Sequence, residues 1–573
     1  MIQIAQLHLP AGADPSGLEM KIRKNLRLKP GDSFTWEIIR HSIDARKKPQ
    51  LLDVYTAGVR LQNESRERAL VRKLGNPNIT YGAPFVWKPP FSATSSESPG
   101  QKRPVIVGFG PAGIFAALVL AEAGLRPIVL ERGSRMDKRI SDILNFRKTG
   151  VLNPSSNIQF GEGGAGTFSD GKLSCGSGDQ GGYQRYVLET FVRAGAPRDI
   201  LTEQLPHIGT DLLREVIVRL RKRIEEAGGE IHFDTRMTGI EITEGKVNAV
   251  RLFSESDSTS GPGKEDRIET DTVLLAVGHS ARDTFRMLHS NNVPMQAKNF
   301  AVGFRVSHPQ AMINEARYGI SDPERMRELR LPPASYKLTF HTKEGRSVYS
   351  FCMCPGGYVV NASSEPGKLA VNGMSDYARD SARANSAIVM AVGPDDFEDS
   401  SVFGGMHFQE KLEKAAFELA GGKTPVESYE LFKSEYEHIS DSDSSYIIDS
   451  SPGFRVLSEK EQNELCLTDS AAFAPLHSLL PENLTNAFLE GMEQFEHRIR
   501  SFTSKECYVI GLESRTSSPV RILRNETRES AITGLYPCGE GAGYAGGIMS
   551  AATDGIRTAE QILAKKSTYC TKI

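Results

Sequence analysis

The stretch PVIVGFGPAGIFAALVLAEAG, which ends at Gly124, restricts the fold of this 573-residue chain more than any other segment. Its apolar start predicts a buried strand, and its apolar end predicts a helix with Pro111 at the first helical position. The turn between them carries Gly108, Gly110 and Gly113 at the spacing G-x-G-x-x-G. Glycines at these places allow a tight turn, the approach of a pyrophosphate to the backbone and close packing of helix on strand. We therefore predict a Rossmann-type unit that binds a dinucleotide.

The next predicted strand, RPIVLER, supports this interpretation because it ends in Glu131, 18 positions after Gly113. A carboxylate at that place can accept hydrogen bonds from an adenosine ribose and repels a 2′-phosphate.

The same glycine spacing occurs twice more, in GEGGAG (residues 161–166) and GAGYAG (residues 541–546). A chain with 53 glycines can produce the pattern by chance, so the flanking sequence decides its meaning. GEGGAG follows the short polar segment SSNIQF and runs into TFSDGKLSCGSG, so it lacks both the buried strand before the turn and the apolar helix after it. We predict a loop here instead of a second dinucleotide turn.

The composition is typical of a soluble globular protein, with 39% hydrophobic residues. No apolar run reaches membrane-spanning length, and the N-terminus lacks a basic region and a small-residue cleavage site, so we expect a cytoplasmic protein without membrane contact. The 7 cysteines form neither a disulfide framework nor a paired C-x-x-C zinc pattern. We expect reduced thiols and no metal site.

The formal net charge of -2 argues against wholesale nucleic-acid binding, but it hides an asymmetry. Residues 1–80 carry 14 Lys and Arg against 8 Asp and Glu. A solvated surface is the simpler explanation of this excess, and a site for RNA or for an acidic partner is the alternative.

Changes of pattern along the chain predict an α/β protein with a discontinuous dinucleotide-binding domain. In the N-terminal module, residues 14–28 and 33–47 are predicted as helices, and residues 300–365 as antiparallel strands followed by helices. The polar stretch FSESDSTSGPGKED is predicted as a loop. The predicted parts are a small N-terminal α+β module at 1–84, a Pro- and Ser-rich linker at 85–103, the dinucleotide-binding domain at 104–298 and 505–573, and an inserted, mostly antiparallel β plus α domain at 299–504 that covers the substrate.

The C-terminal stretch GLYPCGEGAGYAGGIMSAATDG, from residue 534, decides between FAD and NAD. It resembles the last motif of FAD-dependent oxidoreductases of the glutathione-reductase-like superfamily, G-L-Y-A-x-G-D followed by a glycine-led helix. The resemblance implies that Glu540 contacts the ribityl or pyrophosphate region, although this sequence has Glu where Asp is usual. It also implies that Gly546, Gly547 and Ile548 open a helix whose positive end faces the flavin.

Four further segments, NIQFGEGGAGTFSDGKL, FCMCPGGYVVNASSEPG, NGMSDYARDSARANSA and ESRTSSPVRILRN, resemble the group of uncharacterised FAD-dependent, or NAD(FAD)-utilising, dehydrogenases. The resemblance implies FAD as cofactor, hydride transfer through flavin N5, an unidentified small organic substrate, and a nicotinamide only as a transient electron donor. No second strand-turn-helix fingerprint remains for a separate NAD(P)H domain. The residues assigned to FAD are Gly108, Gly110, Pro111, Ala112, Gly113, Glu131, Arg132, Gly163, Gly164, Ala165, Gly166, Ser169, Gly171, Lys172, Met237, Ala276, Gly278, Gly539, Glu540, Gly546, Gly547 and Ile548.

The catalytic candidates are Lys172 and Arg515. Lys172, with Asp170, could bind flavin or orient an anionic substrate, and a loop-capping pair is the alternative. Arg515 and Arg521 could clamp an anion, and surface ion pairs explain them almost as well.

Three other polar residues have simpler structural explanations. Cys352 and Cys354 form C-x-C, for which we favour packed thiols over a redox relay. His279 is favoured as a structural hydrogen-bond donor over a general acid.

Two alternatives to a metabolic oxidoreductase stay open. An RNA-modifying flavoenzyme would use the basic N-terminal module to hold its substrate. A flavin-binding scaffold or redox sensor would hold FAD without turnover.

Overall fold

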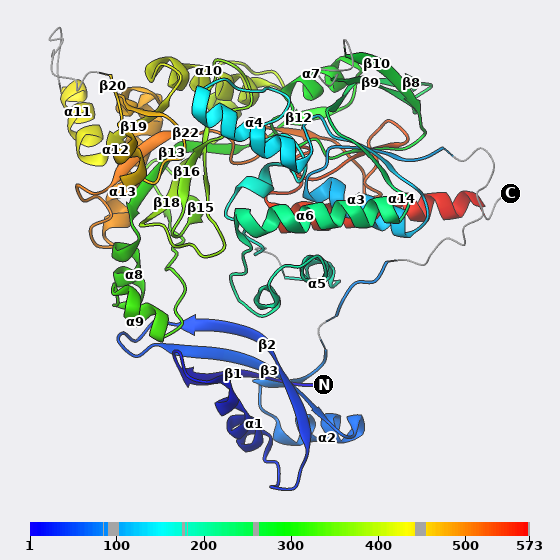
Figure 1. Ribbon diagram of the computed structural model, residues 1–573, viewed down its shortest axis with the longest axis vertical. Helices are drawn as coiled ribbons and strands as arrows, with labels where there is room; N and C mark the ends of the chain where they lie inside the picture. The colour runs from blue at the N-terminus through cyan, green and yellow to red at the C-terminus, as the bar shows by residue number, and fades with distance from the viewer. Residues whose placement is uncertain are drawn as a thin grey trace. The chain divides into compact units, whose positions relative to one another are not determined.

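The computed structural model describes residues 1–83, 85–89, 102–174, 178–179, 181–255, 263–441 and 454–570 (Figure 1). The chain forms two compact units, and each unit is assembled from separate segments of sequence. Most of the predicted linker at 85–103 and the centre of the predicted loop, 256–262, lie outside the described residues. The first unit comprises Met1–Lys88, Lys172–Ile208 and Gln310–Ser335, and the second comprises Pro89–Gly171, Gly209–Pro309 and Tyr336–Ile573.

An antiparallel four-stranded sheet in the order β2-β3-β1-β4 forms the centre of the first unit. Its strands are β1 (Ile2–Pro10), β2 (Phe34–Asp44), β3 (Leu52–Leu61) and β4 (Ile79–Tyr81). Two helices, α1 (Leu18–Leu26) and α2 (Glu64–Leu74), pack apolar side chains against those of the sheet. This part of the chain therefore has a hydrophobic core of its own.

The helix predicted for residues 33–47 is wrong, because this segment contains β2, which pairs with β3 along its length. The sequence FTWEIIRHSID is rich in aromatic and β-branched residues, which favour an extended backbone once a partner strand is present. The helix predicted for residues 14–28 is confirmed as a short 3₁₀ turn followed by α1.

Later segments of the chain join the first unit at the edge of β2. His41 donates its backbone N–H to the carbonyl of Thr202 at 2.7 Å and accepts from the N–H of Gln204 at 3.0 Å. The ring of His41 lies between two carboxylates, with Nε2 2.9 Å from Asp53 and Nδ1 2.8 Å from Glu203. The helices of these later segments are α5 (Tyr183–Arg193), α8 (Gln310–Tyr318) and α9 (Pro323–Glu328).

A parallel five-stranded sheet in the order β24-β11-β5-β6-β7 forms the Rossmann-type part of the second unit. The sheet is discontinuous in sequence, because its edge strand β24 comes from the C-terminal end of the chain. Helices α3 (Pro111–Glu122) and α14 (Ile548–Cys570) are in such close contact that a Cβ on Gly555 would lie 2.2 Å from the carbonyl oxygen of Ala112. The strands are β5 (Val105–Val107), β6 (Ile128–Leu130), β7 (Glu230–His232), β11 (Val273–Leu275) and β24 (Leu535–Pro537).

Smaller elements surround this sheet in the second unit. The antiparallel strands β8 (Thr235–Thr243), β9 (Lys246–Ser254) and β10 (Lys264–Glu269) form a three-stranded sheet. The other elements are α4 (Met136–Thr149), α6 (Gly209–Glu226), α7 (Arg282–Ser290) and the paired strands β12 (Met295–Ala297) and β23 (Val520–Ile522).

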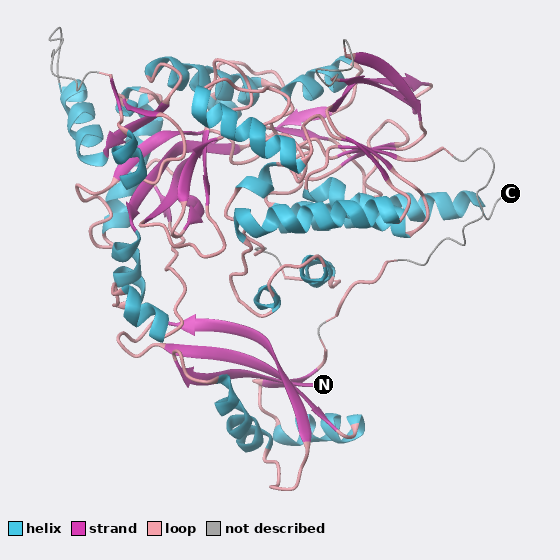
Figure 2. Cartoon of the chain, in the orientation of Figure 1, coloured by secondary structure: helices cyan, strands magenta, loops and turns pink. Residues whose placement is uncertain are grey.

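The predicted antiparallel region is a mostly antiparallel eight-stranded sheet in the order β14-β15-β18-β13-β22-β19-β21-β20. Figure 2 draws strands in magenta and helices in cyan. Its strands are β13 (Phe300–Pro309), β14 (Thr339–His341), β15 (Ser347–Cys354), β18 (Arg383–Val392), β19 (Thr424–Ser428), β20 (Arg455–Val456), β21 (Ala471–Phe473) and β22 (Tyr508–Glu513). The pair β16 (Tyr358–Asn361) and β17 (Val371–Met374) forms a separate ribbon. Helices α10 (Gly404–Leu419), α11 (Tyr429–Asp441), α12 (Glu459–Glu464) and α13 (Glu482–Glu496) complete this part. The described helices include none that is both long and apolar enough to cross a membrane.

Candidate FAD site

The first glycine motif forms the tight turn that the sequence predicts. Gly108 has a φ of +101°, and a Cβ there would lie 2.3 Å from the carbonyl oxygen of Ala276. A Cβ on Gly113 would lie 2.0 Å from the carbonyl oxygen of Gly108, so a larger residue would separate α3 from β5. Because α3 starts at Pro111, its first amide groups have no acceptor within the helix and can bind a phosphate.

Glu131 connects this turn to the second glycine motif. The carboxylate is only 5% exposed and accepts hydrogen bonds from the amides of Phe109 at 2.7 Å and Gly161 at 3.0 Å. A third bond comes from the amide of Gly133 at 2.9 Å. The side chain of Glu131 therefore stabilises the turn by accepting from three backbone amides. A contact between Glu131 and a ribose stays a prediction. The next residue, Arg132, donates to Asp283 at 2.9 Å and lies over the ring of Phe160.

The GEGGAG segment is a loop, as predicted, and it lies against the first motif. Gly163 donates its N–H to the carbonyl of Phe109 at 2.9 Å. Gly164 has a φ of +68°, and a Cβ there would lie 2.8 Å from the Cα of Gly110. A Cβ on Gly166 would lie 2.9 Å from Cγ1 of Ile548, the first residue of α14. The loop therefore fills the space between the starts of α3 and α14.

The C-terminal motif meets the same turn. A Cβ on Gly539 would lie 2.9 Å from the Cβ of Ala112, and one on Gly541 would lie 2.4 Å from the carbonyl oxygen of Gly278. All three glycine-rich segments thus converge, although hundreds of residues separate the first from the last. Of the residues assigned to FAD, the structure brings together those of 108–113, 163–166, 276–278 and 539–548.

Glu540, the acid of the C-terminal motif, is held by two neighbours. Its carboxylate lies 2.8 Å from Nδ1 of His279 and accepts the N–H of Gly547 at 3.2 Å. Burial favours the neutral acid, but the hydrogen bond from His279 and the amide of Gly547 outweigh it and lower the pKa of Glu540. His279 therefore positions the acid, as expected of a structural donor, while its Nε2 is buried without a hydrogen-bond partner among the described residues.

The residues present fit an FAD molecule. A Cβ on Gly278, Gly546 or Gly547 would meet no atom within 4 Å, so the backbone borders open space on the side of Glu540 and His279. Two helix starts, those of α3 and α14, adjoin this space and offer unpaired amide groups to negatively charged parts of a ligand.

Four other residues assigned to FAD make contacts with other parts of the protein. Ser169 donates to the carbonyl of Gly166 at 2.7 Å, and Gly171 donates to Ser169 Oγ at 3.2 Å. Met237 packs in the core cluster between the parallel sheet and β8 to β10. Lys172 belongs to the first compact unit, where it pairs with His207 in an isolated β-bridge.

Arg515, the second catalytic candidate, lies in a buried ion-pair cluster. Its guanidinium donates to both oxygens of Glu413 at 2.9 Å and to Ser280 Oγ at 3.1 Å. Glu413 is fully buried and also accepts two bonds of 2.9 Å from Arg282. Although burial opposes ionisation, the two guanidinium groups hold the pKa of Glu413 well below its usual range. Most N–H groups of Arg515 are thus occupied, which favours a positioning role, and its catalytic role stays a prediction.

The remaining candidates differ in their surroundings. Asp170 is buried and accepts from Nε of Arg379 at 3.0 Å, so one of its partners is a distant arginine, and its role beside Lys172 stays a prediction. Arg521 lies over the ring of Tyr544 at 5.2 Å, and its Nε is buried without a hydrogen-bond partner in the described chain. Cys354 donates its thiol to the carbonyl of Cys352 at 3.3 Å.

Sequence reasoning missed two arginines, Arg214 on α6, which lies over the ring of Phe168 just after the GEGGAG loop, and Arg147 on α4, whose charge acts on Arg214. Both have a buried Nε without a hydrogen-bond partner among the described residues. Neither belongs to a motif, and surface arginines at helical spacing are common, so the sequence carries no signal that separates them from the others.

Comparisons with known proteins agree with this geometry. The sequence model of a family described as "FAD-dependent protein, C-terminal domain-like" matches residues 299–516, and that of a domain of unknown function matches residues 1–60. A protein of Clostridium beijerinckii, titled only as uncharacterised, is 40% identical over 568 residues, which cover 98% of this chain and 99% of that protein.

Solved structures with similar folds are distant in sequence. Quinol fumarate reductase of E. coli is 13% identical with a TM-score of 0.35, covering 82% of this chain and 71% of that one. Glycerol-3-phosphate dehydrogenase from Bacillus halodurans, complexed with FAD, is 10% identical with a TM-score of 0.35, covering 83% and 66%. The family match identifies FAD as the cofactor. Together with the Clostridium relative, it shows that the chain belongs to a family of uncharacterised FAD-dependent proteins.

Proposed function

We propose that this protein is an FAD-dependent oxidoreductase that exchanges a hydride with a small organic substrate. The observation that carries the proposal is the convergence of three glycine-rich segments around open space at Gly278, Gly546 and Gly547. When bound, FAD supplies two-electron chemistry at its N5 atom.

The chain's own residues would bind and tune the cofactor. The amides at the start of α3 would hold the pyrophosphate, and Glu131 stabilises the turn that precedes them. The amides at the start of α14 would stabilise negative charge on the flavin, and Glu540, held by His279, accepts from the N–H of Gly547 and so fixes it in place. A nicotinamide would serve only as a transient electron donor.

The proposal is tested by anaerobic titration of the purified protein with NADH, NADPH and a panel of metabolites. Absorbance at about 450 nm reports the oxidation state of the flavin ring. We expect yellow protein that one of these donors bleaches within seconds to minutes. Flavin that is bound but resists every donor would favour the scaffold or sensor, and colourless protein that cannot be reconstituted would exclude both.

A matched variant controls for free flavin. Gly547→Leu fills the open space, so it should remove FAD and abolish the signal. Gly367→Leu adds the same side chain at another glycine with positive φ and open surroundings, and it should retain FAD.

A further inference from the structure

Two half-buried arginines in the second unit, Arg147 and Arg214, have few hydrogen-bond partners among the described residues. Arg214 lies 4.6 Å from the ring centre of Phe168 and donates only a long bond of 3.4 Å to Thr210 Oγ1. Nε of Arg147 lies 3.8 Å from Oδ1 of Asp469, too far for a hydrogen bond, and its Nη2 donates a weak hydrogen bond of 3.8 Å to Met374 Sδ. The Nε atoms of both arginines have no hydrogen-bond partner among the described residues.

The two arginines are close enough to repel each other. Burial and then the charge of Arg147 lower the pKa of Arg214, while Asp376 and Asp211 oppose the shift. Within the described chain, Arg214 forms no ion pair with a carboxylate. Like charges and buried N–H groups without acceptors cost stability, and a ligand that accepts from both arginines would offset this cost.

Arg139 shows how the same fold satisfies a buried arginine. It also lies 4.6 Å from the Phe168 ring, but it donates to the backbone carbonyls of Asn157, Ile158, Glu162 and Gly164. Arg214 has no such set of acceptors, so its stacking on Phe168 leaves one edge of the guanidinium unsatisfied.

The arginine pair is joined to the FAD site through the GEGGAG loop. Thr210 Oγ1, which accepts from Arg214, donates in turn to the carbonyl of Thr167 at 2.8 Å. Thr167 and Phe168 follow Gly166, which contacts the first residue of α14. A ligand on the arginine pair would therefore lie on the loop that adjoins the flavin.

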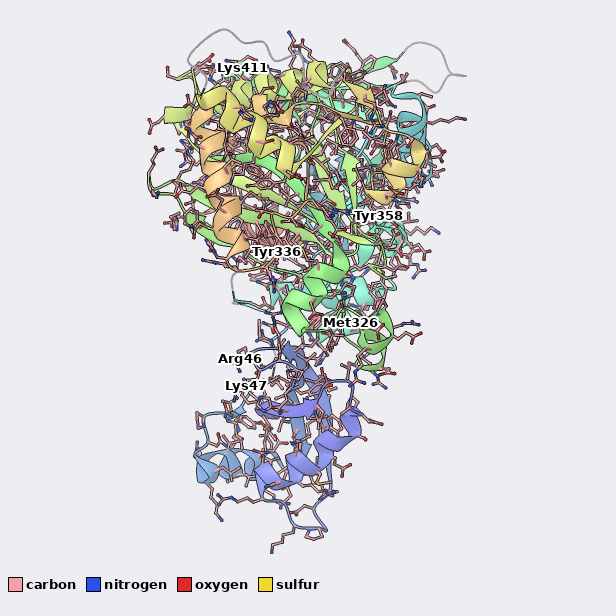
Figure 3. All side chains as sticks on the ribbon, turned by 90° about the vertical axis from the view of Figure 1, so that its left-hand side faces the viewer. Arg46, Lys47, Met326, Tyr336, Tyr358 and Lys411 are labelled. Atoms are coloured by element: carbon pink, nitrogen blue, oxygen red, sulfur yellow. The ribbon has the colours of Figure 1, made fainter. Side chains whose placement is uncertain are left out.

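The neighbouring acids restrict the charge of that ligand. Burial and the charge of Asp211 raise the pKa of Asp376, and burial raises that of Asp469. Tyr358, labelled in Figure 3 and located on β16, is close to Asp376, which contributes to raising the pKa of the phenol after burial. These acids repel the single charge of a carboxylate less than the two charges of phosphate, and a carboxylate also matches the forked geometry of arginine.

We propose that Arg147 and Arg214 bind the carboxylate group of the organic substrate. This inference rests on the proposed oxidoreductase function and specifies its substrate class. The carboxylate would accept from the free Nε–H of each arginine, which places the rest of the substrate along Phe168 toward the cofactor.

The test uses the FAD-loaded protein and a panel of mono- and dicarboxylates, each paired with its neutral amide, and inorganic phosphate. Binding is measured by calorimetry and by the difference spectrum of the flavin. We expect at least one carboxylate to bind, and its amide to bind at least about tenfold more weakly. Arg214→Gln and Arg147→Gln should each weaken the carboxylate by about tenfold to a hundredfold, and Arg214→Lys by less.

Lys222→Gln is the matched control, because it removes one exposed positive charge from the same helix and should leave binding unchanged. FAD content and reduction by dithionite show whether each variant is folded and loaded. The inference is overturned if no carboxylate binds better than its amide, if both glutamine variants bind like the wild type, or if phosphate binds more tightly. In each case a flavin that is still reduced by an organic donor leaves the oxidoreductase proposal intact.

Discussion

The ring of His41 lies 2.9 Å from the carboxylate of Asp53, and its other nitrogen lies 2.8 Å from Glu203. Burial alone would lower the pKa of His41, but the two hydrogen bonds outweigh it and raise the pKa to about 9. These two contacts of His41 link β2, β3 and the segment at 202–204 within the first unit.

This arrangement predicts a loss of stability in mild base. Since the folded pKa of about 9 exceeds the unfolded value of 6.5, the contribution of His41 is complete below pH 6.5 and is lost as the pH rises through 9. Thermal unfolding between pH 6 and 10 should show the difference between wild type and His41→Gln shrinking with pH, from about 1–2 kcal/mol after allowance for solvent screening. His341→Gln, an exposed histidine, should show no such trend.

His308 predicts the opposite response in acid. Its ring is fully buried and its Nε2 lies 2.7 Å from the carbonyl of Phe502, and burial lowers its pKa to about 4. Because the folded pKa is below the unfolded one, its neutral form stabilises the second unit above pH 6.5, and this contribution is lost as the pH falls through 4. We expect His308→Gln to be less stable at pH 7 but to lose less stability on acidification. Equal acid sensitivity in both proteins would contradict the assignment.

Gly164→Ala should weaken FAD binding. The new Cβ would lie 2.8 Å from the Cα of Gly110 at a φ of +68°, so the two glycine motifs must separate. We expect a fall in FAD affinity of about tenfold or more, measured by flavin fluorescence during reconstitution. Gly345→Ala has a similar φ of +85° without a contact within 4 Å, and it should cost stability without changing FAD affinity.

Glu413→Gln should destabilise the second unit strongly. The change leaves Arg282 and Arg515 without their shared buried carboxylate, which costs about 3–5 kcal/mol in comparable buried pairs. Denaturant unfolding followed by far-UV circular dichroism and flavin fluorescence measures the loss, because both tryptophans, Trp36 and Trp87, lie in the first unit. Glu410→Gln, on the same helix but partly exposed, should cost about 1 kcal/mol or less. Comparable losses in both variants would show that the cluster does not depend on Glu413.

The sequence predicted the glycine-rich turns because the contacts that require them are local. Gly108 and Gly113 are required by contacts within one strand-turn-helix unit, and the loop character of GEGGAG follows from its immediate flanks. The pairing of β24 with β11 was accessible only through the resemblance of the C-terminal motif to known flavoproteins.

The parts that could not be predicted depend on distant contacts. Residues 202–204 join β2 through backbone hydrogen bonds, which leave no side-chain signature. Pairing with β3 likewise explains why a segment predicted as a helix forms the strand β2. Arg214 is distinguished from other arginines only by what surrounds it, since its neighbours Phe168 and Asp376 come from separate stretches of the chain. The domain boundaries drawn from the sequence stay predictions.

The edge position of β24 has a consequence for biosynthesis. The nucleotide-binding sheet opens with β5, early in the chain, and receives its final strand and the helix α14 only from the C-terminal end. During translation, β5 and α3 are therefore made long before β24 and α14, and the parallel sheet stays incomplete while the intervening eight-stranded sheet is made. A product that stops before β24 lacks an edge strand of the sheet and helix α14, and we expect it to be unable to hold FAD.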